Sequence, residues 1–120
     1  MQLKSALYEM RLESQKDIDK HCAFQYGLLR VMMIVSSTSD YDEVLDAIDN
    51  FYDDCIISYS ENEYNMAAFQ TIQRLLDHIL YHLEHTEPTD LPSFQRLLIK
   101  IYNYETKEEA IQKKEEIHIS

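Results

Sequence analysis

The chain has 120 residues, a length that suits one compact domain spanning residues 1–120. Its single glycine excludes the glycine-rich loops that bind phosphates and dinucleotides, and glycine scarcity favours helices over sheets. The formal net charge of −11 argues against nucleic acid, and against an anionic membrane surface, as a direct ligand.

Cellular location is predicted from features that the sequence lacks. No apolar run approaches the roughly 20 residues of a membrane-spanning helix, and the first ten residues lack the pattern of a signal peptide. Cys22 and Cys55 fit neither a disulfide framework nor a zinc-binding pattern, so we expect two reduced thiols in the core. Together these features predict a cytoplasmic protein.

Apolar residues recur every three or four positions from Leu3 to Val35. This spacing predicts either one long helix or two helices separated by a break between Ser14 and Asp19. The stretch 22–35 is the most apolar part of the chain, and we expect it to form the central buried helix.

Three later helices are predicted from start signals that precede apolar stripes. These signals are Asp40 with Glu43, Ser60 with Glu63, and Asp90 with Pro92. Residues 56–60 are ambiguous, because their β-branched and aromatic side chains also suit a short strand or an irregular segment. Residues 107–120 have few apolar anchors and either fray or form an extra exposed helix. The predicted fold is all-α, a compact bundle of four to five antiparallel helices.

Negative charge is concentrated in one part of the chain. Between Arg30 and Arg74 there are nine acidic residues and no lysine or arginine. Helical geometry places four of the aspartates within a stripe of roughly 60° opposite the apolar stripe. Tyrosines, which are enriched at protein interfaces, are interleaved with the acids. We predict a partner-binding face made of Asp42, Glu43, Asp46, Asp49, Tyr52, Asp53, Asp54, Glu61 and Glu63; the alternative is a merely solubilising face.

Three histidines, His78, His82 and His85, have the spacing by which one helix face can bind a metal ion. We favour a second interpretation, in which they are the last-turn residues that a helix dipole stabilises. We therefore assign no metal and no cofactor. The chain offers no serine in a glycine-flanked turn and no cysteine with an activating neighbour, so we expect no enzymatic activity.

The charge pattern predicts a protein that binds and occludes a basic partner, either a toxin or a nucleic-acid-binding enzyme. An immunity protein or antitoxin that neutralises a nuclease-like toxin fits this prediction best. One alternative is a helical adaptor or secretion chaperone that holds a client protein in apolar grooves. A second alternative is a histidine-based metal-binding bundle. The sequence leaves open whether the protein is a monomer or a homodimer.

Overall fold

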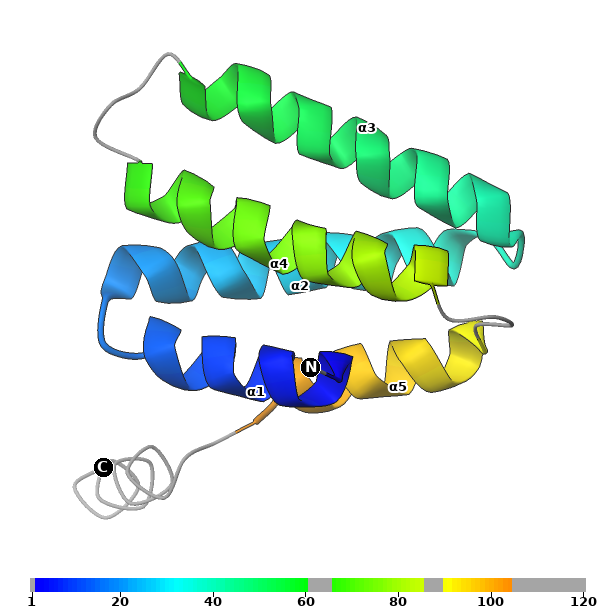
Figure 1. Cartoon of the computed structure of the whole chain (residues 1–120), viewed down its shortest axis with the longest axis horizontal. Helices are drawn as coiled ribbons and strands as arrows, with labels where there is room; N and C mark the ends of the chain where they lie inside the picture. Colours follow the sequence, from blue (N-terminus) through cyan, green and yellow to red (C-terminus); the bar gives the residue numbers. More distant parts are fainter. Residues whose placement is uncertain (1, 61–65, 86–89, 105–120) are drawn as a thin grey trace, which may run out of the picture.

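The computed structural model describes residues 2–60, 66–85 and 90–104, and over these ranges every regular element is a helix (Figure 1). The five helices are α1 (Leu3–Ser14), α2 (Ile18–Ser37), α3 (Tyr41–Ser60), α4 (Met66–His85) and α5 (Leu91–Tyr102). The predicted all-α bundle is thus confirmed. None of the described helices is long and apolar enough to cross a membrane.

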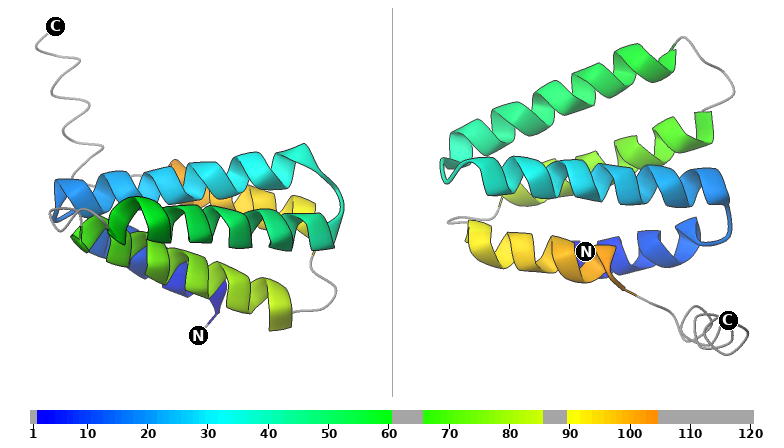
Figure 2. Two further views of the ribbon diagram at one scale, coloured as in Figure 1. Left: turned by 90° about the horizontal axis from the view of Figure 1, so that it is seen from above. Right: turned by 180° about the vertical axis from the view of Figure 1, so that it is seen from behind.

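The helices form three layers, which Figures 1 and 2 show from three sides. The middle layer contains α2 and α4, the short helices α1 and α5 cover one side of it, and α3 lies alone on the other side. Helix α3 packs against α2 and α4, α1 packs against both α2 and α4, and α5 packs mainly against α2. Because α3 forms an outer layer by itself, one whole side of this helix faces outward.

The first two helices are separate, which confirms the second of the two predicted alternatives. The break falls between Ser14 and Ile18, and Asp17 caps α2 by accepting hydrogen bonds from the backbone N–H groups of Asp19 and Lys20. A side-chain acceptor at this position satisfies N–H groups that have no partner within the helix. Short polar segments with a capping aspartate therefore explain where this chain turns.

Asp40 caps α3 as the start signal predicts, because its Oδ1 accepts from the backbone N–H of Asp42 at 2.9 Å. In a capping box the Glu43 carboxylate would accept directly from the backbone N–H of Asp40, but here Thr38 lies between the two groups. The backbone N–H of Asp40 donates to Thr38 Oγ1, and that hydroxyl donates to the Glu43 carboxylate at 2.6 Å. Thr38 thus relays the contact between the cap and the first turn of α3.

Residues 56–60, for which a short strand or an irregular segment was the open alternative, are helical, because α3 continues to Ser60. Ile56 and Ile57 stay helical although both side chains are exposed. The turn before them packs through the buried Phe51 and Cys55, so each backbone N–H in this last part of the helix finds its carbonyl partner four residues earlier. A local β preference of about half a kcal/mol per residue does not outweigh that packing.

Helices α2 and α4 approach closely at the one glycine of the chain. A Cβ atom built on Gly27 would lie 2.7 Å from Cδ2 of Leu75, whose side chain is fully buried. Phe24 and Leu28, on the same side of α2, are also fully buried. The absence of a side chain at Gly27 therefore lets the two central helices pack at short range.

Two predictions about α2 need correction. Cys22 is exposed, so only Cys55 is a core thiol. The helix is also not buried on all sides, because Leu29 and Met33 remain exposed. Apolar residues occupy both sides of α2, whereas the other four helices leave the side with Leu29 and Met33 uncovered.

Candidate interaction surface

The outward side of α3 carries the acidic residues that the sequence singled out. Val44, Ile48, Phe51 and Cys55 are buried and recur at spacings of four and three, so they define the side that faces the bundle. The six acidic side chains of the helix are all exposed: Asp42, Glu43, Asp46, Asp49, Asp53 and Asp54. Glu61 and Glu63, also predicted for this face, lie outside the described residues.

Glutamate 84 of α4 extends this acidic face beyond α3. The pKa of Asp49 is raised above its usual value, first by partial burial, then by Glu84, and then by its neighbours Asp46 and Asp53. Glu84 is not among the predicted residues of this face, because it lies 35 positions from Asp49 in the sequence. The sequence did hold one sign that α4 lies beside α3: a short connection between two helices implies that they are antiparallel neighbours.

Arg30 and Arg74, the two arginines that bound the acidic segment, do not neutralise the outward face of α3. The guanidinium of Arg30 lies 5.0 Å from the centre of the Phe51 ring, beneath the side of α3 that faces α2. Arg74 forms an ion pair with Glu13 of α1 at 2.6 Å, on the side of α4 away from α3. Because no lysine or arginine lies between these two residues, the outward face of α3 has no base on its own helix.

Tyr52 lies at the junction of α3 and α4 and not on the outward stripe. Tyr52 is half-buried, and its hydroxyl donates to the Asp77 carboxylate and accepts from the Gln73 amide. Burial raises the pKa of Tyr52 most, the hydrogen bond from Gln73 opposes this, and Asp77 raises it further. Tyr52 therefore links two helices, and a partner can reach only its exposed edge.

Two of the three histidines of α4 make ring contacts with different residues, while His78 is half-buried beside Arg74 and Asp77 at a surface hollow. The ring of His82 stacks on Phe94 of α5 with centroids 6.1 Å apart, and burial lowers the pKa of His82. The ring of His85 stacks on Tyr81 at 4.1 Å, and its Nδ1 lies 2.9 Å from the Tyr81 carbonyl oxygen. Within the described ranges, no three His, Cys, Asp or Glu side chains are grouped so that they could hold a metal ion.

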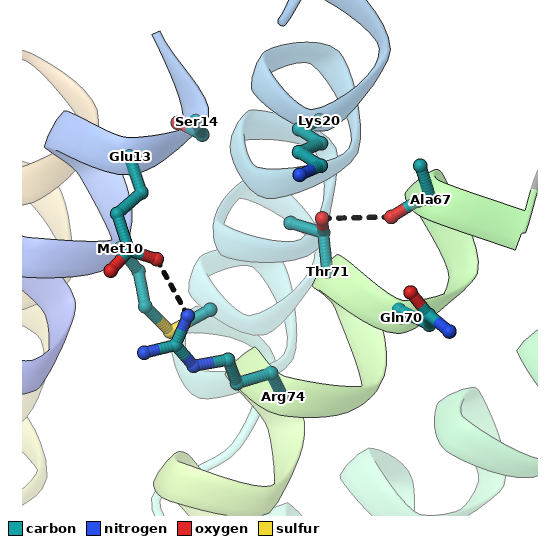
Figure 3. A pocket seen from close by; sticks show the side chains of 8 residues that line it. All are labelled: Met10, Glu13, Ser14, Lys20, Ala67, Gln70, Thr71 and Arg74. Atoms are coloured by element: carbon teal, nitrogen blue, oxygen red, sulfur yellow. Dashed lines mark hydrogen bonds and ion pairs between the residues drawn. The ribbon is translucent and has the colours of Figure 1, made fainter. Parts of the chain in front are cut away.

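A pocket of about 210 Å³ lies between α1, α2 and α4 (Figure 3). The ion pair between Glu13 and Arg74 crosses one side of it, and Thr71 donates its hydroxyl to the Ala67 carbonyl at 2.8 Å. The buried hydroxyl of Ser14 donates to the Arg11 carbonyl. The hydrogen bonds of these side chains are thus made within the bundle, and the arrangement suits a structural contact between three helices.

Comparisons with known proteins give no family for this chain: no family model, no curated protein and no solved structure matches it.

Proposed function

We propose that this protein is a non-enzymatic inhibitor that binds a basic partner protein through the outward face of α3. The observation that carries this proposal is the exposure of all six acids of α3 on a helix that has no base of its own. Glu84 of α4 adds a seventh carboxylate beside Asp49. Such a surface has a directed negative field, which attracts a basic protein at long range and orients its approach.

The proposed mechanism is occlusion of a basic groove. The stripe from Asp42 to Asp53 covers about 16 Å of helix axis, enough to lie along a groove that normally holds several phosphates. Its carboxylates would pair with the lysines and arginines that bind those phosphates. An immunity protein or antitoxin that neutralises a nuclease-like toxin would work in this way, and the partner is therefore proposed to be a nuclease-like protein.

The local energetics of α3 support a role for this face beyond solubility. Asp46, Asp49 and Asp53 lie three or four positions apart, and each such pair of like charges costs a few tenths of a kcal/mol. A lysine at any of these sites would remove that cost and keep the protein charged. A basic partner that binds across the stripe would instead convert the repulsion into binding energy.

The test uses a panel of purified basic nuclease domains with pI above about 9 as probes. We expect the full chain to inhibit at least one of them with a stoichiometric end point, and we expect inhibition to weaken as salt increases. The double variant Asp46→Lys/Asp53→Lys should lose this inhibition. If the protein inhibits no member of the panel, or inhibits equally with both aspartates replaced, the proposal is wrong.

A further inference from the structure

Helix α2 has an apolar stripe on the side that faces away from the core. Ile18, Cys22, Tyr26, Leu29 and Met33 follow one another at spacings of four, four, three and four, so they share one side of the helix. All five are exposed, Ile18 by 77% and Met33 by 57%. We call these five residues the α2 stripe. Its five side chains are uncharged, although the outer side of a surface helix is normally polar. Tyr26 lies at the edge of the stripe nearest α3, where its ring contacts Phe51 and the guanidinium of Arg30.

The apolar surface continues from α2 onto α5. The Gln25 amide donates to the Tyr102 carbonyl and the Gln95 amide donates to the Met32 carbonyl, which fixes α5 alongside α2. Ile99, one turn beyond Gln95, is 39% exposed at the edge of this junction. The exposed side chains of α2 and Ile99 of α5 thus form one apolar patch, and contiguous exposed apolar patches often mark interaction sites.

An apolar hollow lies at the end of α2 that follows Met33. It has a volume of about 500 Å³, and it lies between the end of α2, the start of α3 and the first turn of α5. Val35, Tyr41 and Pro92 are among its lining residues.

We propose that the α2 stripe is the interface of a homodimer in which α2 packs in parallel against α2 of a second copy. Cys22, Tyr26, Leu29 and Met33 alternate by four, three and four residues, which is the spacing of the seam of a two-stranded coiled coil. In a parallel pair each of these residues meets its own copy across a two-fold axis that runs along the helices. The spacing of the α2 stripe therefore suits packing against the same stripe of a second copy of the chain.

Charge selects the parallel arrangement over the antiparallel one. Helix α3 lies on one side of α2 and α5 lies on the other (Figure 2). A two-fold axis along α2 places α3 of one copy opposite α5 of the other, whereas an axis perpendicular to α2 places α3 opposite α3. Helix α3 has six acids and no base, and α5 has Arg96 and Lys100 and no acid. The parallel dimer therefore keeps the two acidic α3 helices apart, whereas the antiparallel dimer would bring them together.

In this dimer the two α3 helices lie at opposite sides of the assembly, with their outward faces free. The dimer does not depend on the proposed inhibitor function, since its interface is formed by α2 and α5. It would present two acidic faces in one particle, and a partner with two basic sites would then bind with avidity.

The oligomeric state of the full chain is measured by sedimentation equilibrium over a range of concentrations. We expect a dimer for the wild type, and we expect Leu29→Glu and Met33→Lys each to raise the dimer dissociation constant by about 30-fold or more. The matched control is Leu12→Glu, which replaces a leucine of similar exposure on α1 and should leave the dimer intact. A wild type that is monomeric at every concentration, or a dimer that Leu29→Glu and Met33→Lys leave unchanged, overturns the proposal.

The relative orientation of the two α2 helices in the dimer is tested by oxidation with copper phenanthroline. In the parallel dimer the two Cys22 thiols meet at the seam, close enough for a disulfide, so the oxidised protein should run as a covalent dimer. The band should disappear in Cys22→Ser and persist in Cys55→Ser, because Cys55 is buried. A non-covalent dimer that forms no Cys22 disulfide overturns the parallel arrangement.

Discussion

Asp49 of α3 and Glu84 of α4 carry like charges across the junction of their helices, and this repulsion raises the pKa of Asp49. Partial burial is the larger cause of the shift, and Asp46 and Asp53 contribute less than Glu84. The described part of α3 contains no base that could relieve this repulsion. The face that we propose as a binding site therefore costs the folded protein some stability.

Neutralising Asp49 should stabilise the protein. We expect Asp49→Asn to increase the free energy of unfolding at neutral pH by a few tenths of a kcal/mol, a modest gain because water screens a largely exposed group. The folded pKa of Asp49 lies above its unfolded value, so the cost is absent at low pH and appears as pH rises through the unfolded and then the folded pKa. Urea unfolding at acidic and neutral pH measures both effects.

Asp42→Asn is the control for this experiment, because neutralising Asp42 should change the free energy of unfolding in the opposite direction. Asp42 lies in the first turn of α3, where a negative charge is stabilised by the helix dipole. Its neutralisation should lower stability by about 0.3–1 kcal/mol. If both variants were destabilised equally, repulsion at Asp49 would not be the dominant effect.

Removing the hydroxyl of Tyr52 should loosen the junction between α3 and α4. We expect Tyr52→Phe to cost about 1 kcal/mol, since Gln73 and Asp77 each lose a hydrogen-bond partner. The folded pKa of Tyr52 is raised, so the wild type should lose stability as pH rises through the unfolded and then the folded pKa of this tyrosine. Thermal unfolding of both proteins at neutral and alkaline pH tests this, and a variant that loses the same stability at high pH as the wild type would contradict it.

The short distance between Gly27 and Leu75 predicts a steep dependence on side-chain size. In Gly27→Ala the higher helix propensity of alanine, about 1 kcal/mol, offsets the shift that the flexible end of Leu75 must make. Gly27→Leu adds far more volume to a packed core, and we expect a loss of about 3 kcal/mol. Chemical denaturation of the two variants distinguishes these outcomes, and equal stability would show that α2 and α4 can separate freely.

The cap of α5 should weaken in acid. Hydrogen bonds from the hydroxyl and the backbone N–H of Ser93 hold the pKa of Asp90 below its usual value, and Arg96 acts in the same direction. The stabilising effect of this carboxylate is therefore present above its unfolded pKa and is lost as pH falls through its folded pKa. The melting temperature of Asp90→Asn should depend less on pH than that of the wild type between pH 5 and 2, and parallel curves would contradict this.

Local signals in the sequence predicted where α2, α3 and α5 begin. The start signal predicted at Ser60 is wrong, because Ser60 is the last residue of α3 and α4 begins at Met66. Asp17 lies in the interval where a break was one of two alternatives, and Asp40 and Asp90 act as the caps that were predicted. The buried stripe of α3 follows from its spacing alone, because residues three and four apart share one side of a helix. Caps and helical spacing depend on residues that are close in the sequence, so they can be recognised without knowing how the helices pack.

Features that depend on the other helices could not be predicted from the sequence. Periodicity shows that Cys22 and Leu29 belong to an apolar side of α2, but not that the bundle leaves this side uncovered. The approach of Glu84 to Asp49 depends on the register between α3 and α4, which no local pattern encodes. Tyr52 was predicted as a contact residue, whereas its hydroxyl bonds to α4.

The binding role of α3 is tested most directly by comparing two variants of equal net charge. Asp46→Lys/Asp53→Lys changes the outward face of α3, and Glu9→Lys/Asp19→Lys changes exposed acids on α1 and α2. Each replacement adds two charges, so both variants carry −7 in place of −11. The measurement is the association rate with an inhibited nuclease domain at low salt. We expect the α3 variant to associate about 10–100-fold more slowly and the other variant to resemble the wild type; equal rates for the two variants would contradict the account.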